Sequence, residues 1–300
     1  MTSSPSTVAP GTKAPTKTPK KHRRRGELGP VAQAGTHVAL AAASLIALFP
    51  IVWLVYLSLG PAKDDYLHPG GILAKATLDN YSFVLTNTAF FNWLWSTLVV
   101  AGGTTLFGVM SAATTGYAVS RMRFPGHRPL MWVLLLTQAF PIAVLIVPMY
   151  EIFSQLRLVD SHLGLILVNC TTIVPYCSWL LKGYFDTIPI ELDEAGMIDG
   201  LTPFGTFWRL ILPLARPGLA VAAFYAFITA FAEVAFASTF LLDDSKYTFA
   251  VGLQSFISEH DAQWNLMAAT AVLIAIPVTI FFYLVQRHVV TGLTAGGVKG

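Results

Sequence analysis

Apolar segments of about 20 residues recur six times along this 300-residue sequence, and they constrain the fold more than any other feature. A segment of that length is what an α-helix needs to cross the hydrocarbon core of a membrane. The predicted spans cover residues 37–59, 93–119, 130–150, 163–181, 218–242 and 266–285. The sequence therefore predicts an all-α, polytopic integral membrane protein with six transmembrane helices.

The composition agrees with a membrane location and excludes most classes of enzyme. Hydrophobic residues make up 54% of the chain, charged residues only 12%, and the mean hydropathy is +0.61. Six spans leave too little chain for a soluble catalytic domain. Cys170 and Cys177 lie within one apolar segment and have no CxxC or zinc-site spacing, so we interpret them as small packing residues.

Residues 1–35 differ from the rest of the chain. They are rich in Ser, Thr, Pro and Lys and contain the basic run KKHRRR at 20–25, which is typical of a disordered tail. The apolar segment that follows is too long for a cleaved secretory signal, so it predicts a retained signal anchor. A nucleic-acid-binding arm is the alternative interpretation of the basic run. We favour a topogenic cluster beside the membrane, with no nucleic acid partner.

Basic residues predict the orientation. If the tail is cytoplasmic, 15 Lys and Arg residues lie inside, whereas only Lys63, Lys75, Arg157 and Lys246 lie outside. Without the tail the ratio is 8 to 4, which retains the excess expected on the cytoplasmic side. We therefore expect a multi-pass protein of the plasma membrane with both termini in the cytoplasm.

Motifs for catalysis are absent from the sequence. It contains no GxxxxGK[ST] phosphate loop, no HExxH, no GxSxG and no pair of histidines at metal-ligand spacing. A self-contained ATPase pump is thereby excluded. A gradient-driven carrier remains, as does a non-catalytic subunit of a larger machine whose nucleotide is bound by another chain.

The predicted cytoplasmic connection 182–217 is unusually long, and its pattern predicts two short helices. In the first, Pro189 suits the start, three acids favour the positive end of the helix dipole, and Gly200 suits a left-handed end. The acids are Glu191, Asp193 and Glu194. The second begins with Thr202 as N-cap. Such a pair suits docking into a groove of a partner protein; a helix resting on lipid is the alternative, but carboxylates disfavour it.

The spacing of several residues in this connection resembles the EAA loop of permease subunits of binding-protein-dependent ABC importers. The matching residues are Glu194, Ala195, Gly200, Leu212 and Pro213. Gly196 stands where the motif has its second alanine, which lowers helix stability by about 0.5 to 1 kcal/mol, and Leu210 replaces its isoleucine. The stretches 247–252 and 292–300 are similar to carbohydrate permeases of the maltose and maltodextrin (MalG) type.

This resemblance implies a type I permease fold over residues 36–300. It also implies a second permease subunit, two cytoplasmic ATPase subunits that hold ATP and Mg, an extracellular sugar-binding protein, and surrounding membrane lipid. The expected function is import of a sugar, such as maltose, maltodextrin or a related oligosaccharide. A gradient-driven secondary transporter is the alternative and predicts inverted internal repeats. A membrane-embedded enzyme predicts carboxylates or histidines clustered at membrane depth.

The resemblance also implies which residues couple this chain to the ATPases. They are Glu191, Asp193, Glu194, Ala195, Gly196, Met197, Ile198, Asp199, Gly200, Leu201, Leu212 and Pro213. The glycine-rich tail after Arg287 either frays, as chain ends usually do, or reaches the ATPase pair through residues 293–300.

Polar residues within the spans are candidates for the translocation path. They are Thr137, Gln138, Asn169, Thr172, Tyr176 and Glu233, each of which could instead form hydrogen bonds between helices. Glu233 is the one carboxylate deep in a predicted span, with structural, path-lining and proton-relay roles left open. For contact with the binding protein the candidates are Tyr247, Phe249, Phe256 and Trp264.

Overall fold

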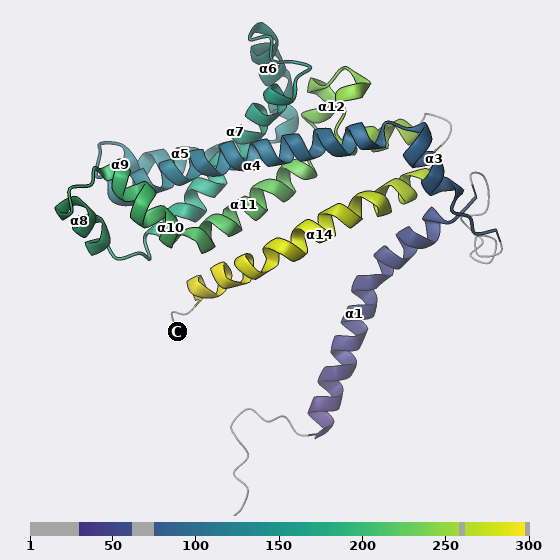
Figure 1. Ribbon diagram of the computed structural model, residues 1–300, viewed down its shortest axis with the longest axis horizontal. Coiled ribbons are helices and arrows are strands. Elements are labelled where there is room, and N and C mark those ends of the chain that lie inside the picture. The colour runs from purple at the N-terminus through teal and green to yellow at the C-terminus, as the bar shows by residue number, and fades with distance from the viewer. Residues whose placement is uncertain (1–29, 62–74, 258–261, 298–300) are drawn as a thin grey trace, which may run out of the picture. The chain divides into compact units, whose positions relative to one another are not determined.

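The computed structural model describes residues 30–61, 75–257 and 262–297 and divides the chain into two units, 1–51 and 52–300. The regular secondary structure of these residues is helical (Figure 1). Helix α1, Pro30–Ser58, begins in the first unit. It starts seven residues before the predicted span, because proline is well tolerated in a first helical turn. Residues 30–35 of the predicted disordered tail are therefore helical, and residues 1–29 lie outside the described residues.

Four helices form the centre of the second unit. They are α4 (Phe90–Arg121), α7 (His162–Phe185), α11 (Arg216–Phe231) and α14 (Trp264–Gly297). A Cβ atom at Gly116 would lie 3.0 Å from backbone atoms of Ser178 and Lys182, so α4 and α7 approach closely there. Gly108 similarly faces Ile173. The small residues of the second predicted span thus form a helix-packing seam, as expected for helices in lipid.

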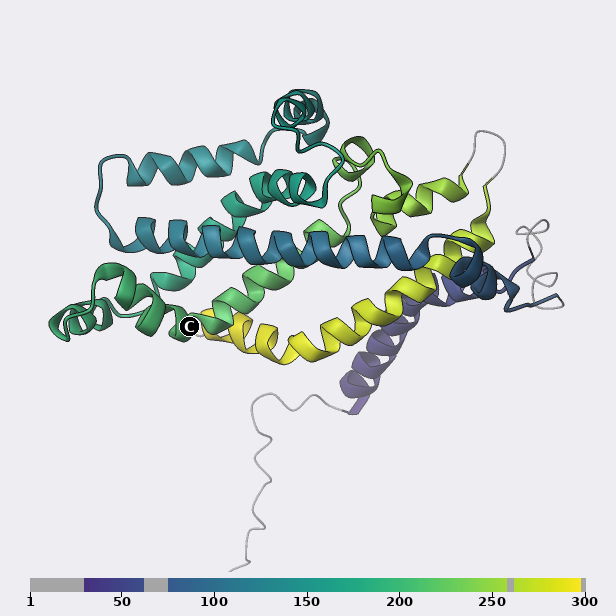
Figure 2. The ribbon, with the colours of Figure 1, turned by 45° about the horizontal axis from the view of Figure 1, so that its top comes forward.

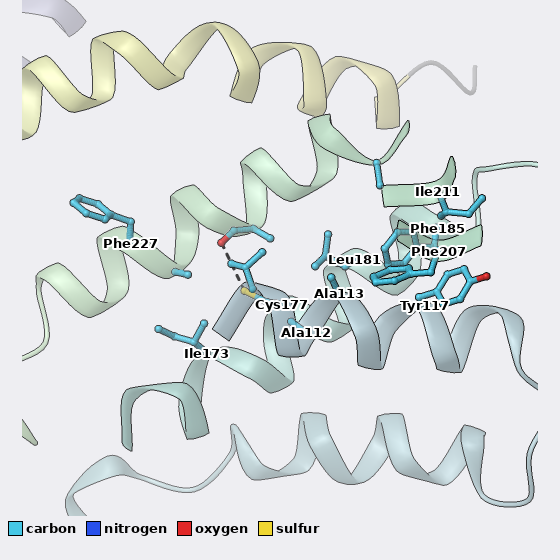
Figure 3. Close-up of a cluster of buried hydrophobic side chains, with 14 of the residues drawn as sticks. Ala112, Ala113, Tyr117, Ile173, Cys177, Leu181, Phe185, Phe207, Ile211 and Phe227 are labelled. Carbon is cyan, nitrogen blue, oxygen red and sulfur yellow. Dashed lines mark hydrogen bonds between the residues drawn. The ribbon is translucent and has the colours of Figure 1, made fainter. Parts of the chain in front are cut away.

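Large apolar side chains fill the space between these helices and the connection that follows α7. Figure 3 shows Tyr117 of α4 and Phe185 of α7 converging with Phe207 and Ile211. Cys177 lies in the same cluster, fully buried, and its thiol donates to the carbonyl oxygen of Ala222 at 3.7 Å. This cysteine is a packing residue, as predicted.

Two predicted spans are not continuous helices. Residues 130–150 form α5 (His127–Thr137) and α6 (Ile142–Gln155), which are bent by 99° at a short break; in Figure 2, α6 is seen end-on and α5 lengthwise. Pro141 stands at the break, where it cannot donate a helical hydrogen bond. The predicted span 218–242 is also wrong in its second half, because α11 ends at Phe231 and only the short α12, Ala237–Phe240, follows.

By length and composition, three of the described helices could cross a membrane, or up to five if each of two bent pairs counts as one span. The second bent pair joins Pro203–Leu214 to Arg216–Phe231 at 82°. Helix α14 adds a shorter apolar stretch, Trp264–Ile280, and continues to Gly297, so most of the glycine-rich tail is helical rather than frayed.

Short elements pack where α4 begins. They are α3 (Asp79–Asn87), η2 (Asp244–Lys246), α13 (Phe249–Gly252) and η3 (Leu253–Phe256). The side-chain amide of Asn80 donates to the carbonyl oxygens of Ser58 at 2.8 Å and Gly60 at 2.7 Å, and Asn265 donates to Asn80 at 2.7 Å. These bonds tie the start of α14 to α3 and to the chain that enters it.

Candidate coupling site and membrane path

The connection 182–217 contains the two predicted helical segments, but Pro189 lies before the first helix and the second is divided into three short elements. Helix α8, Glu191–Ile198, carries its three acids in the first turn, and Gly200 has φ +84°, the left-handed conformation that favours glycine. The Thr202 side chain then caps α9, Pro203–Thr206, by accepting from the N–H of Gly205 at 3.1 Å. The π-helix η1, Phe207–Ile211, and α10, Leu212–Leu214, lead into α11. Figure 1 shows α8 projecting at one end of the helical bundle.

Helix α8 contacts its own chain mainly through two residues. Asp193 and Gly196 are buried, whereas the other six residues of the helix are exposed. Residues three apart lie on one face of a helix, so this inward face is a narrow stripe. The opposite face is free to contact another protein.

Asp193 lies at the end of α4. Its Oδ1 atom accepts a hydrogen bond of 2.7 Å from the Tyr117 hydroxyl, and its Oδ2 atom lies 3.0 Å from Nε of Arg121. The side chains of Arg121 and Asp193 are only 11% and 9% exposed. Arg121 also donates through Nη2 to the carbonyl oxygen of Ile188 at 2.7 Å. A buried, charge-paired cluster therefore joins α8 to the last turn of α4.

Gly196 allows the close packing of α8 on the segment that follows it. A Cβ atom at position 196 would lie 2.8 Å from Cδ1 of Leu210 and 2.9 Å from Oγ1 of Thr206. The departure from the alanine of the EAA pattern is thus a packing feature. The expected loss of helix stability is accompanied by a closer approach of two helices.

The outward face of α8 combines acids with exposed apolar side chains. Ile198 is 86% exposed and Met197 51%, and Glu191, Glu194, Ala195 and Asp199 are also exposed. Such apolar residues on a projecting helix are typical of an interaction site. Leu201 is half-buried, and Leu212 packs against the buried cluster, so Leu212 and Pro213 belong to the bend into α11 and not to this face.

The structure brings three of the path candidates together at the break between α5 and α6. Thr137, Gln138 and Thr172 line a cavity of about 490 Å³ with Pro175 and apolar side chains. The Gln138 amide donates to the carbonyl oxygen of Thr172 at 2.6 Å, which links the end of α5 to α7. Polar atoms in an apolar cavity are what recognition of a hydroxylated ligand requires.

The other three path candidates lie elsewhere. Tyr176 packs against Tyr225 with ring centroids 4.3 Å apart, and neither side-chain polar atom of the buried Asn169 has a hydrogen-bond partner among the described residues. Glu233 accepts from the N–H groups of Phe236 at 2.7 Å and Ala237 at 3.0 Å. It therefore caps α12, which is the structural role left open for it.

Two candidates for binding-protein contact are buried within the chain. Phe249 and Phe256 are each only 7% exposed, and the ring of Phe256 packs edge-on against Trp93 at a centroid distance of 6.0 Å. Aromatic residues in a connection can fill a core as readily as a surface. Tyr247 is half-buried, and Trp264, at 50% exposure, remains accessible.

A polar clamp in this region was missed by the reasoning from sequence. The Lys246 amino group donates to Oδ2 of Asp160 at 2.5 Å and to its backbone oxygen at 2.9 Å. The N–H groups of Leu242 and Asp243 donate to Oδ1 of Asp160 at 3.0 and 3.1 Å. The bond from Lys246 is the main reason that the pKa of Asp160 lies below its usual value. The only sequence signal was one acid and one base in two predicted loops on the same side.

No group of three or more His, Cys, Asp or Glu residues that could hold a metal ion occurs in the part of the chain that the structure describes. The projecting α8, the bent helix pairs and the apolar helices together define a multi-pass membrane permease.

The match to a family model identifies the family of permeases to which this chain belongs. Residues 104–294 match the binding-protein-dependent transport system inner membrane component, and the chain belongs to that family. The matched region includes the end of α4 and the whole connection that carries α8.

Curated relatives agree over most of the chain. The chain is 42% identical over 214 residues to the maltose/maltodextrin transport system permease protein MalG of Salmonella typhimurium, covering 69% of this chain and 72% of the relative. It is 35% identical over 285 residues to MalG of Vibrio vulnificus, covering 88% and 95%. Both relatives are permease proteins, which confirms the type of subunit.

Two solved structures share the fold. A bacterial ABC transporter involved in import of the acidic polysaccharide alginate matches with a TM-score of 0.70 and 22% identity over 90% of this chain and 99% of the other. The inward-facing MetNI methionine ABC transporter matches with a TM-score of 0.55 and 18% identity over 68% and 95%. The predicted type I permease fold is thus confirmed.

Proposed function

We propose that this chain is the permease subunit of an ATP-driven importer that carries maltose, maltodextrin or a related oligosaccharide into the cell. The outward face of α8 carries the proposal, because a projecting helix with an acidic start and exposed Met197 and Ile198 needs a partner. The similarity to MalG proteins supports the sugar class.

The proposed complex contains a second permease subunit, two cytoplasmic ATPase subunits and an extracellular sugar-binding protein. ATP and Mg are bound by the ATPase subunits, and this chain supplies part of the membrane path. In this arrangement α8 docks into the ATPase, and Asp193 and Gly196 hold it on the membrane helices. Both termini and α8 then lie on the cytoplasmic side, in line with the excess of basic residues predicted there.

The first test addresses docking. Ile198→Asp places a charge on the most exposed apolar position of α8, so it should weaken retention of the ATPase subunits by at least about 10-fold while this chain stays folded. Leu78→Asp is the matched control, since Leu78 is 69% exposed and lies directly before α3, away from α8. Equal retention in both variants would refute the docking role of α8.

The second test addresses transport. The chain reconstituted with its ATPase and permease partners should import the sugar only with ATP and the binding protein present. Uptake by this chain alone, driven by an ion gradient, would instead establish a secondary transporter.

A third test addresses the sugar. Maltose-class sugars should raise the unfolding midpoint of the cognate binding protein, and other sugars in the panel should leave that midpoint unchanged.

A further inference from the structure

A second cavity opens at the same end of the bundle as α8 but on another side of Arg121. It has a volume of about 490 Å³ and lies between the last turn of α4, the start of α5 and the end of α7. The charged and aromatic residues that line it are Arg121, Arg123, His127, Lys182, Trp132 and Trp179. We propose that this cavity binds the headgroup of an anionic phospholipid.

The cavity has a strong charge bias. None of the described residues that line it is acidic. Two of its cations already have partners, since Arg121 pairs with Asp193 at 3.0 Å and Lys182 with Asp186 at 2.6 Å. Arg123 forms no ion pair with any described residue. Its charge is therefore available to a ligand.

His127 adds a second polar group with a defined direction. Its Nδ1 atom lies 2.8 Å from the carbonyl oxygen of Phe124, so Nδ1 donates there and the ring is held in place. The Nε2 atom is left for another partner. A phosphodiester offers oxygen acceptors that suit the guanidinium of Arg123.

The position and surroundings of the cavity favour a lipid over free phosphate. Trp132 is 73% exposed and Trp179 48%, and tryptophans gather where membrane meets water. On α5 the exposed face continues from Trp132 to Val133 and Leu136, which are 57% and 63% exposed. Acyl chains can lie along this apolar face while the headgroup occupies the cavity. Basic pockets between membrane helices bind anionic headgroups in this way.

The experiment uses the full chain purified with the subunits that accompany it, titrated with phosphatidylglycerol or phosphatidylcholine and followed by native mass spectrometry. Phosphatidylglycerol should bind more tightly than phosphatidylcholine. Arg123→Gln should weaken it about 5-fold. Arg123→Lys should retain most of the affinity.

Arg216→Gln is the matched control, because Arg216 is exposed on the same end of the bundle and does not line the cavity. It should bind phosphatidylglycerol within twofold of the unaltered chain. Equal affinity of Arg123→Gln and the unaltered chain would overturn the proposal, as would displacement of the lipid by inorganic phosphate at similar concentration. Should Arg123→Gln fail to fold, the lack of any preference for phosphatidylglycerol in the unaltered chain would overturn it equally.

Discussion

Replacing Asp193 by asparagine should release α8 from the end of α4. The amide can still accept the hydrogen bond from Tyr117, so the substitution removes chiefly the charge that faces Arg121. Breaking a buried ion pair by removing one partner costs about 3 to 5 kcal/mol. Because both side chains keep some exposure and Arg121 keeps its bond to Ile188, we expect the lower value, about 3 kcal/mol.

The substitution should destabilise the packing of α8 on α4 and leave the rest of the bundle unchanged. A change of about 3 kcal/mol raises the population of molecules in which α8 is detached from α4 about 150-fold. Hydrogen exchange of the α8 amides should accelerate by the same factor, while exchange in the middle of α4 stays unchanged. Coupled ATPase activity should fall, because α8 cannot transmit movement to the membrane helices once it is detached from α4.

Two further variants decide whether loss of the ion pair causes the faster exchange of α8. Asp199→Asn changes an exposed acid at the end of the same helix and should alter the exchange by less than about 0.5 kcal/mol. Arg121→Met combined with Asp193→Leu removes both charges and should recover most of the stability, since a buried pair can be replaced by apolar groups at little cost. Similar exchange in Asp193→Asn and Asp199→Asn would refute the reasoning.

Three other predictions follow from single contacts. Gly196→Ala should lower the midpoint of thermal unfolding, by an amount equivalent to about 1 to 3 kcal/mol, because its methyl group would meet Leu210 at 2.8 Å; an unchanged midpoint would show that α8 can move aside. The Asp160–Lys246 clamp should stay closed above the usual pKa of aspartate and open as the pH falls through the lowered pKa of Asp160. Hydrogen exchange of residues 241–248 measures the opening, and Asp160→Asn should remove its acid dependence. Glu233→Gln should reduce stability by no more than about 1 kcal/mol and leave uptake independent of proton gradients, because the amide oxygen can still cap α12; abolished uptake with intact folding would instead indicate a proton relay.

Local features of the candidate site were predictable from sequence. The first-turn acids of α8, the left-handed Gly200 and the cap at Thr202 each depend on neighbouring residues and follow helix-terminus rules. The pairing of α8 with α4 was not predictable in this way. Tyr117 and Asp193 are 76 residues apart, and no periodicity in the sequence relates them.

Apolar length predicted where membrane helices occur but not where they bend. Residues 130–150 are mostly apolar and contain no charged residue, so hydropathy does not register the 99° bend at Pro141. The burial of aromatic residues between α12 and α14 was not predictable for a related reason. Phe249 and Phe256 lie in a connection, yet they fill the space beside Trp93, and composition does not distinguish an exposed ring from a buried one.

The length of α4 has a mechanical consequence. At 1.5 Å per residue, its 32 residues extend about 48 Å, from Phe90 to Arg121. Arg121 meets Asp193 of α8 at one end, and at the other Trp93 lies so close to α13 that a Cβ atom at Gly252 would be 2.3 Å from its ring. Helix α4 thus connects α8 directly to the opposite side of the bundle. If α8 docks as proposed, a tilt of α8 would displace the Trp93 end of α4 without passing through intermediate loops.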